Sequence, residues 1–498
     1  MASRILHELI TDKSYPHLSF PILEEVYPRE LVCQVLHEVG CWEKRERKLN
    51  HVLMVFLLIA WTMMPTMALK QVFSQLTSFL RWMSAQAPWP LPTASALCYR
   101  RHTLGVAPLR LLMRLACKPL CQPSTPGAFL FGRRLVALDS KLIDVCDTAE
   151  NDWVFRGRTQ DDQPRRRSPF PQLRLLSALE IGSHAHLGAV LAPGYRPEMT
   201  LVQDVLPFLP ADSLVLQDAG YRGAWWIQRL KHAGHDSITR LQAHDYLCKG
   251  PRLADGSYLV STSGSPDAPL QEPLTLRIIE YRLDAQIAEP LSQLQRSRVR
   301  SGLRKEVSAD QVYRLATTLL DPVLAPAKEI AASYHERWEL ELVYDELQEH
   351  QLSTPRLLSK TAQGVMQEAW ALLLGHYALR AWMMQAAGEP EELDVDRLSF
   401  TQALSVLGTA LTLSEPLQWI PKEQWKSRVV HDLRQRDRLL PEKRRGRSYP
   451  RVIKTASTRF FVKREQDIPF VFPDTTKSWK DFVFPLHGVE TCPEILLI

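Results

Sequence analysis

The chain lacks the signatures of several large enzyme classes. Its 498 residues contain no P-loop, no Gly-x-Ser-x-Gly elbow and no dinucleotide-binding glycine fingerprint. It also has no internal repeat and no low-complexity tract. Hydrophobic residues at 45% and charged residues at 23% are ordinary globular values, which excludes wholesale disorder. A length of this order predicts about three domains.

Cysteines are few and scattered. None of the eight lies in a Cys-x-x-Cys spacing, so neither a disulfide framework nor a zinc site is indicated. They read as reduced, intracellular thiols. The first residues, Met1–Lys13, contain no apolar stretch with a cleavage site, so no secretory signal is expected.

Only one long run is free of charge. Val52–Leu69 spans 18 residues, near the lower limit for a membrane-spanning helix, but Thr62, Pro65 and Thr66 interrupt its second half. We therefore predict a helix buried in an all-α module, and no membrane association.

Positive charge is concentrated near the C-terminus. The net charge is only +6, yet the stretch Lys422–Arg464 holds fifteen Lys and Arg against four Asp and Glu. A second basic run, Arg165–Arg167, lies within Arg156–Arg167. Such tracts are expected to contact a polyanion, without reading its sequence. The alternative is an exposed basic tail.

Periodicity divides the chain into five regions. Residues 1–120 show helical spacing throughout, and alternating strands and helices over 128–244 indicate an α/β unit. Residues 245–311 read as a β-rich insertion, 312–400 as a strand followed by long helices, and 401–498 as the basic C-terminal region. Within the α/β unit, Leu135–Leu138 and Leu142–Val145 are predicted to form a hairpin.

The helical N-terminal region carries two arginines at the end of a short helix. Thr93–Thr103 begins with a hydroxyl cap, follows a proline-rich turn, and ends in Arg100 and Arg101. This arrangement fits a helix-turn-helix DNA reader with both arginines on DNA. It fits equally well a packing module with two solvated arginines.

Two aspartates stand where predicted strands end. Asp139 follows one apolar run and Asp218 follows another, and ligand sites form at strand ends in α/β sheets. Glu341 lies on the predicted helix Ala327–Gln351. Two strand-borne aspartates and a helix-borne glutamate can hold two Mg²⁺ ions that stabilise an in-line phosphoryl displacement.

One face of that helix is rich in polar groups. Residues spaced by three and four place five side chains together, which are Tyr334, Arg337, Glu341, Tyr344 and Gln348. An arginine one turn from a metal-ligating glutamate can pair with a phosphate. The alternative is an amphipathic helix with an Arg337–Glu341 ion pair.

Three blocks in this order resemble the bacterial insertion-sequence transposases of the IS-four type. The stretch from Tyr334 to Gln348 resembles their Tyr-x2-Arg-x3-Glu-x6-Lys signature. The sequence Ala-Leu-Asp-Ser-Lys around Asp139 resembles their first aspartate block, and Leu-Gln-Asp-Ala-Gly-Tyr around Asp218 resembles the second. Weaker similarity extends the resemblance over about residues 25–480.

The resemblance implies an α/β fold: an RNase H-like core interrupted by a β-rich insertion, with an all-α N-terminal domain that binds DNA. It implies DDE chemistry, in which Mg²⁺ (or Mn²⁺) held by Asp139, Asp218 and Glu341 supports strand cleavage and then attack by the freed 3′-OH. Within this group that attack typically gives a hairpin on the opposite strand. Tyr334 and Arg337 would grip the phosphate beside the scissile bond.

The chain departs from the family pattern at two places. Gln348 replaces the signature lysine, which removes a positive charge expected to contact DNA. Ser140 and Lys141 stand where many relatives have Gly-Thr. Neither change removes an expected metal ligand.

The sequence thus predicts a cut-and-paste DNA transposase that works in the bacterial cytoplasm, at the nucleoid when bound to DNA. Its expected partners are double-stranded DNA, as terminal inverted repeats and target, and a second copy in a homodimeric synaptic complex. DNA contacts are expected from Gln348 and from four residues of the C-terminal tract, Lys443, Arg444, Arg445 and Arg447. The alternatives are a transposase-derived DNA-binding protein without strand transfer, and a metal-dependent nuclease.

Overall fold

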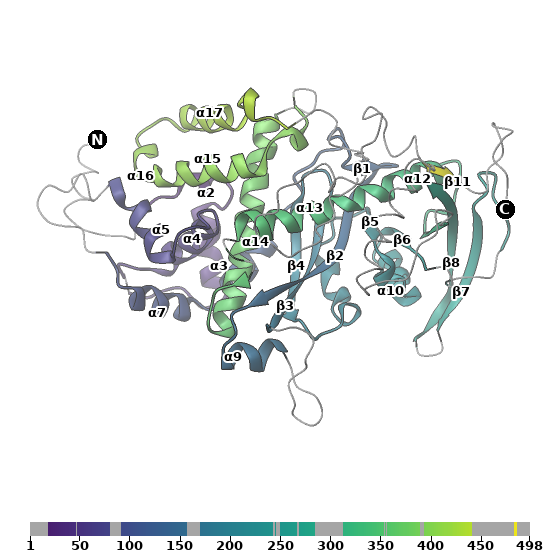
Figure 1. The fold of residues 1–498 in the computed structure, drawn as a ribbon, viewed down its shortest axis with the longest axis horizontal. Coiled ribbons are helices and arrows are strands. Elements are labelled where there is room, and N and C mark those ends of the chain that lie inside the picture. The colour runs from purple at the N-terminus through teal and green to yellow at the C-terminus, as the bar shows by residue number, and fades with distance from the viewer. Residues whose placement is uncertain are drawn as a thin grey trace, which may run out of the picture. The chain divides into compact units, whose positions relative to one another are not determined.

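A computed structural model of the chain (Figure 1) describes most of its residues. The described ranges are 18–45, 47–79, 91–156, 170–242, 245, 250–265, 268–283, 312–352, 354, 356–388, 393–440 and 483–485. The fold divides into two compact units. Unit 1 comprises residues 1–128, 139–209 and 339–440, and unit 2 comprises 129–138, 210–338 and 441–498.

Unit 1 is mostly helical. Its N-terminal helices are α2 (Pro21–Glu24), α3 (Arg29–Glu38), α4 (His51–Thr62), α5 (Leu69–Leu76), α7 (Ala94–Leu104) and α8 (Ala107–Ala116). Short turns follow at α9 (Ala149–Asn151), η2 (Asp152–Arg156), η3 (Glu198–Thr200) and η4 (Val202–Phe208). Its later helices are α13 (Glu339–Asp345), η7 (Glu346–Gln351), α14 (Ala362–Ala387), η8 (Val395–Arg397), α15 (Phe400–Thr412), α16 (Ser414–Leu417), α17 (Lys422–Leu433) and η9 (Arg436–Arg438).

Two apolar helices form the core of unit 1. Helix α4 is buried along almost its whole length, and the side chain of Asn50 caps it by accepting from the backbone N–H of Leu53. Helix α14 packs against α4, α8, α15 and α17 and is buried on nearly every side. Among the described residues, no helix is long and apolar enough to cross a membrane. The prediction that the run beginning at Val52 forms a buried helix is confirmed.

Strand β2 (Arg133–Val145) belongs to both units, since its first six residues lie in unit 2 and the rest in unit 1. In unit 1 it is accompanied by β3 (Gln172–Glu180), by β4 (Ala185–Pro193), which is antiparallel to β3, and by β10 (Arg356–Leu357), which is parallel to β2. The predicted hairpin at this point was wrong. Residues 139–141 have no positive φ, which a two-residue hairpin turn requires, so the chain stays extended.

Unit 2 is built on a mixed sheet. Its strands are β1 (Phe129–Leu130), β5 (Ser213–Gln217), β6 (Asp236–Arg240), β7 (Tyr258–Ser265), β8 (Ala268–Leu283), β9 (Tyr313–Thr317) and β11 (Val483–Pro485). The order is β11-β8-β9-β6-β5-β2, with β2, β5 and β6 mutually parallel and β9 antiparallel to β6. Strand β5 is buried at every position, as expected for a central parallel strand. The expected α/β class with a helical N-terminal region is confirmed.

The β-rich insertion is part of this sheet rather than a separate layer. Strands β7 and β8 form an antiparallel pair, and β8 extends the sheet through β9. Helix α10 (Ala224–His232) packs on β6, β7 and β8. The resulting core includes Ile227, Tyr258, Leu276 and Ile278, all fully buried.

The predicted helix over 327–351 is a helical run of four pieces. It begins in unit 2 with α12 (Ala327–Tyr334) and the 3-10 turn η6 (His335–Trp338), and continues in unit 1 as α13 and the π-helical η7. We call residues 327–351 the glutamate run. Both irregular pieces change the rotation per residue, and π turns inside helices are frequent at functional sites.

Candidate active site

The two aspartates directly follow a pair of hydrogen-bonded strands. Strands β2 and β5 are parallel and in register from Arg134 opposite Ser213 to Leu138 opposite Gln217. Asp139 is the next residue after Leu138, and Asp218 is the next after Gln217. Asp139 was predicted to lie at the end of a strand, but β2 continues to Val145, and only its pairing with β5 ends before Asp139.

Asp218 closes strand β5 and caps the turn that follows. Its Oδ1 accepts a hydrogen bond from the backbone N–H of Gly220 at 2.7 Å, at the start of η5 (Ala219–Tyr221). The carboxylate is half-buried. A side chain held in this way has a defined direction before any ligand arrives.

Asp139 accepts hydrogen bonds both at its carboxylate and at its backbone carbonyl. Its Oδ1 accepts from the N–H of Ser140 at 2.8 Å, and its carbonyl oxygen accepts from the hydroxyl of Tyr344 at 2.9 Å. The hydroxyl of Ser140 donates to Glu198 at 2.5 Å and accepts from Arg174 at 2.7 Å. Ser140 therefore fixes this part of the strand, although it departs from the family's Gly.

Glu341 lies near the beginning of α13, and its side chain lies outside what the structure describes. The prediction that Glu341 is a metal ligand therefore depends only on where its backbone lies in α13. Among the described side chains, no group of three or more His, Cys, Asp or Glu is placed to hold a metal ion. Aspartate carboxylates are nevertheless the hard oxygen donors that Mg²⁺ prefers.

Tyr334 is buried beside the second aspartate strand. Its hydroxyl donates to the carbonyl of Gln217 at 3.3 Å, and the guanidinium of Arg337 lies 5.8 Å from its ring centre. Burial raises the pKa of the Tyr334 hydroxyl. The charge of Asp218 also raises this pKa, whereas the charges of Arg337 and Arg240 lower it. The phenol thus stays protonated and can donate. Gln348 lies half-buried in the π-helical η7.

The neighbouring histidine is held neutral. Burial lowers the pKa of His335 to about 3, with Arg240 and Arg337 acting in the same direction. Its Nε2 lies 3.2 Å from the hydroxyl of Tyr281. The imidazole adds no positive charge near physiological pH.

Arg240 was not among the predicted site residues. Strands β5 and β6 are in register up to Gln217 opposite Thr239. Arg240 is the last residue of β6 and comes directly after Thr239, as Asp218 comes directly after Gln217. Its guanidinium lies 5.5 Å from the ring of Tyr313. The signal was available, because the strand-end argument used for the aspartates applies equally to a basic residue at the end of β6.

The two N-terminal arginines are engaged inside the protein. Arg100 is 8% exposed and donates to the carbonyl of Leu49 at 2.6 Å and to Glu43 at 2.5 Å. Arg101 donates to Gly364 and Gln367 of α14. Neither guanidinium is presented on the surface as both predicted alternatives required, so their contact with DNA stays a prediction. The hydroxyl cap at Thr93 is confirmed, since it accepts from Ala96.

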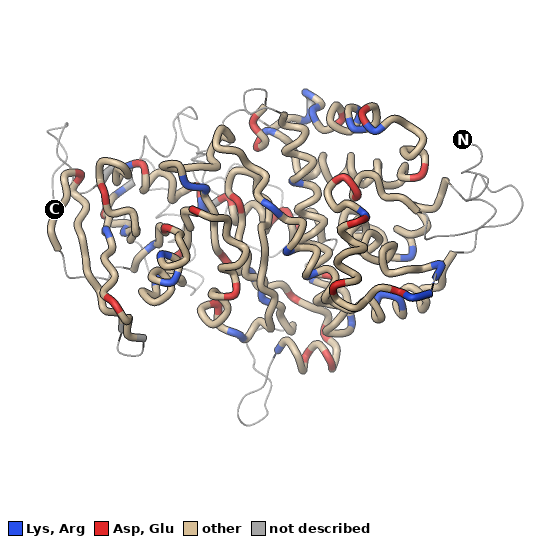
Figure 2. The backbone as a smooth tube through the Cα atoms, turned by 180° about the vertical axis from the view of Figure 1, so that it is seen from behind, with Lys and Arg blue, Asp and Glu red and all other residues tan. Residues whose placement is uncertain are grey.

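The described part of the C-terminal basic tract is largely paired. Figure 2 shows basic and acidic positions side by side on α17, where Lys422 and Lys426 both contact Glu25 and Arg428 lies 3.5 Å from Asp432. The predicted DNA contacts Lys443, Arg444, Arg445 and Arg447, and the run Arg165–Arg167, lie outside the described residues.

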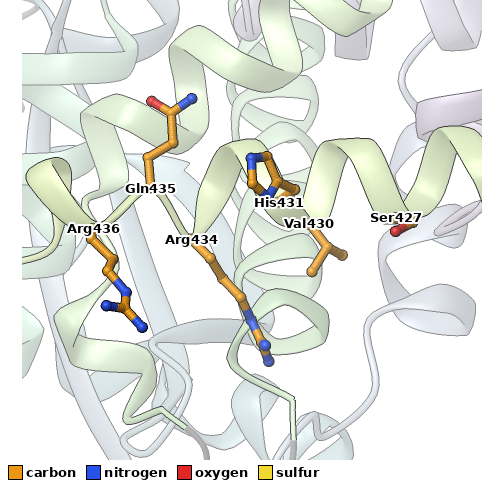
Figure 3. A pocket seen from close by; sticks show the side chains of 6 residues that line it. All are labelled: Ser427, Val430, His431, Arg434, Gln435 and Arg436. Carbon is orange, nitrogen blue, oxygen red and sulfur yellow. The ribbon is translucent and has the colours of Figure 1, made fainter.

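A hollow of about 580 Å³ lies at the C-terminal end of α17. Figure 3 shows the described side chains that line it, which are Ser427, Val430, His431, Arg434, Gln435 and Arg436. Arg434 donates to the carbonyls of Ala386 and Ala387, and so caps the end of α14. None of these described lining residues was predicted as part of the active site.

Two family models match the chain. The model of the insertion element 4 transposase N-terminal domain matches residues 17–114, and that of the transposase DDE domain matches residues 130–377. The second range includes Asp139, Asp218 and Glu341. It agrees with the expected RNase H-like class.

Individual proteins are similar as well. The chain is 26% identical over 439 residues to the transposase InsG for insertion sequence element IS4 of Escherichia coli (strain K12), covering 85% of this chain and 90% of that protein. It is 26% identical over 133 residues to the putative transposase InsZ of the same strain, covering 27% and 44%. A cryo-EM structure of the piggyBac transposase synaptic complex with hairpin DNA aligns over 86% of each chain, with a TM-score of 0.41 and 11% identity.

Proposed function

Because the chain belongs to the insertion element 4 family of DDE transposases, we propose that it moves a DNA element by cut-and-paste transposition. Such an enzyme cleaves DNA and transfers its strands. We propose that it cleaves at the terminal inverted repeats of its element and that the freed 3′-OH attacks the opposite strand, giving a hairpin that is reopened before integration.

One observation carries this proposal. Asp139 and Asp218 directly follow the paired residues Leu138 and Gln217 on adjacent parallel strands, both within the range that matches the DDE domain. Glu341 lies in α13, and Tyr344 of the same helix bonds to the backbone of Asp139. We propose these three acidic residues as the metal ligands.

The DDE domain depends on a divalent metal ion, and we propose Mg²⁺, with Mn²⁺ able to replace it. Two such ions would stabilise the attacking and leaving oxygens of the phosphodiester. In cleavage, water attacks phosphorus and the 3′-oxygen leaves as a hydroxyl. In strand transfer that hydroxyl attacks a second phosphodiester and displaces its 3′-oxygen, so the number of phosphodiester bonds is conserved.

The protein's own residues would hold the DNA around this site. We propose that Arg337 pairs with the phosphate beside the scissile bond, together with Tyr334. Gln348 would contact the DNA by a neutral hydrogen bond where relatives use a lysine. The tract containing Lys443, Arg444, Arg445 and Arg447 is proposed as a further DNA contact.

The proposed organisation follows the sequence. Residues 1–120 would form the DNA-binding domain, 128–244 and 312–400 the catalytic core, 245–311 its insertion and 401–498 the basic region. We propose that two copies hold two element ends in the synaptic complex, and that the enzyme acts at the bacterial nucleoid.

A second candidate is a transposase-derived DNA-binding protein without strand transfer. Gln348 favours it, because the missing lysine removes a charge at the signature position. The retained acidic residues favour catalysis.

The deciding experiment incubates the protein with Mg²⁺ and a linear duplex that carries the genomic ends flanking its coding sequence. Cleaved, hairpin and joined products are separated on denaturing gels. We expect all three from the native chain and none from Asp139→Asn or Asp218→Asn. DNA binding without cleavage by the native chain would support the second candidate. Nicked products without joined ones would indicate a nuclease.

A further inference from the structure

Tyr344 connects the helix of Glu341 to the strand of Asp139. It lies one turn after Glu341 on α13, is buried, and donates its hydroxyl proton to the carbonyl oxygen of Asp139 at 2.9 Å. Both residues belong to unit 1. This hydrogen bond joins positions that are 205 residues apart in the chain.

The bond falls at the place where β2 leaves β5. The register between these strands ends at Leu138, and the next carbonyl, that of Asp139, accepts from Tyr344. The ammonium group of Lys141 lies 5.9 Å from the Tyr344 ring centre, so the phenol contacts β2 through its ring as well.

The helical end of this connection is fixed independently. Glu346, two residues after Tyr344, pairs with Arg380 and lies 3.0 Å from His376, both on α14. Burial acts to raise the pKa of Glu346, but Arg380 and His376 outweigh it and hold that pKa well below its usual range. This largely buried ion pair therefore anchors η7, which directly continues the helix α13 that carries Tyr344.

A similar bond occurs in unit 2. There Tyr334 donates to the carbonyl of Gln217, the residue before Asp218. The glutamate run thus bonds through a tyrosine hydroxyl to the backbone at or next to each aspartate.

We propose that Tyr344 is a positioning residue, which fixes the backbone of Asp139 relative to α13 so that the carboxylates of Asp139 and Glu341 meet a metal ion in one geometry. This inference rests on the proposed function. It assigns to Tyr344 no contact with DNA or with the metal.

The test removes the hydroxyl and keeps the ring. In Tyr344→Phe we expect Mn²⁺ affinity to fall about ten-fold, the scale seen when groups that orient metal ligands are lost. The bound Mn²⁺ is measured by electron paramagnetic resonance on the full-length protein. DNA cleavage should slow by a similar factor, while the Kd for DNA stays unchanged.

Tyr27→Phe is the matched control. Tyr27 is buried in unit 1 and donates its hydroxyl to the carbonyl of Leu374 at 2.6 Å, so its loss removes the same kind of bond elsewhere. A general loss of stability would affect both variants. We expect Mn²⁺ affinity to change only in Tyr344→Phe.

A donor at the same position should restore the function. Tyr344→p-aminophenylalanine keeps an N–H that can reach the carbonyl, whereas Tyr344→p-methylphenylalanine fills the space without a donor. We expect near-native Mn²⁺ affinity in the first and weakened affinity in the second. This pair also decides the question if Tyr344→Phe fails to fold, because both side chains fill the native volume.

Two results overturn the proposal. Unchanged Mn²⁺ affinity in Tyr344→Phe, or equal affinities in the two non-natural variants, would refute a positioning role. Asp139→Asn separates this failure from that of the proposed function. If Asp139→Asn loses Mn²⁺ binding and Tyr344→Phe does not, only the role of Tyr344 is wrong. If Asp139→Asn binds Mn²⁺ like the native chain, the assignment of the metal ligands itself fails.

Discussion

The two ends of the glutamate run are anchored by different chemistry. At the start, in unit 2, Arg277 of β8 donates to the carbonyl of Ala325 at 2.6 Å and pairs with Asp255, which accepts from the N–H of Ala327. At the end, in unit 1, Glu346 of η7 forms an ion pair with Arg380 of α14 and lies 3.0 Å from the neutral imidazole of His376 on the same helix. The first anchor combines an ion pair with hydrogen bonds to backbone groups, whereas the second depends on side chains alone.

The two anchors should therefore respond differently to the loss of their arginine. Without Arg277, the carbonyl of Ala325 is a neutral group, and Asp255 still accepts from the N–H of Ala327. Without Arg380, the largely buried carboxylate of Glu346 loses its ion-pair partner and retains only His376. The end of the run near Tyr344 should therefore be the more sensitive of the two to a single substitution.

The largest effect is expected from Arg380→Met. It leaves the Glu346 carboxylate buried without its main partner, which should lower the free energy of unfolding by about 3–5 kcal/mol. Urea unfolding followed by circular dichroism measures the change. In the double variant with Glu346→Gln, at least half of the loss should return. An Arg380→Met protein as stable as the native chain would show that Glu346 is not held by charge.

Arg277→Met should cost less, about 2–3 kcal/mol, because the carbonyls that it leaves unpaired are neutral. The carboxylate of Asp255 also loses its arginine, but its side chain is 21% exposed and it still accepts from the backbone N–H groups of Ser257 and Ala327. Arg277 is fully buried and also donates to the hydroxyl of Ser257 at 2.7 Å. The same urea assay measures it beside Arg380→Met. A larger loss here than for Arg380→Met would reverse the comparison.

Local patterns of sequence indicated candidate residues for the proposed site, but not the groups that hold these residues in place. Asp139 and Asp218 could be found because apolar runs stop at each, and Glu341 because its helix shows regular polar spacing. The hydrogen bond from Tyr344 to Asp139 joins distant parts of the chain, and no local pattern contains it. The same holds for Arg100, whose partners Leu49 and Glu43 are about fifty residues away.

Elements whose burial follows from their apolar composition were predicted correctly. Features that depend on which other strands or helices pack beside them were missed. Helix α4 followed from its apolar composition, and β5 from a short apolar run. The predicted hairpin failed because β2 passes from one neighbouring strand to others at Asp139, and periodicity does not reveal a change of neighbours. The 3-10 and π pieces of the glutamate run were missed for the same reason, since tertiary packing sets them.

The third prediction concerns pH, because each unit buries a neutral histidine near the run. Burial lowers the pKa of His335 in unit 2 to about 3 and also lowers that of His376 in unit 1. Both values lie below that of the unfolded chain, about 6.5, so the unfolded state binds more protons below that pH. Stability should therefore fall as the pH drops from about 6.5 toward 3, by about 2 kcal/mol from His335 alone at pH 5.

His335→Gln tests this directly. Glutamine does not titrate, so the loss of stability between pH 7 and pH 5 should shrink, while the contribution of His376 remains. Urea unfolding at a series of pH values gives the slope. An unchanged slope would mean that His335 takes up its proton in the folded state.

The smallest effect is expected from Lys422→Ala, which provides an exposed counterpart to the two buried anchors. Lys422 shares Glu25 with Lys426, and its side chain is 60% exposed against 3% for Arg380. Water screens its charge, and Lys426 still pairs with the carboxylate, so the free energy of unfolding should fall by less than about 0.5 kcal/mol. The same urea assay in low and high salt checks this, since the difference from the native chain should vanish in high salt. A loss comparable to that of Arg380→Met would show that burial is not what separates strong from weak ion pairs in unit 1, and the contrast between the two ends of the glutamate run would need another cause.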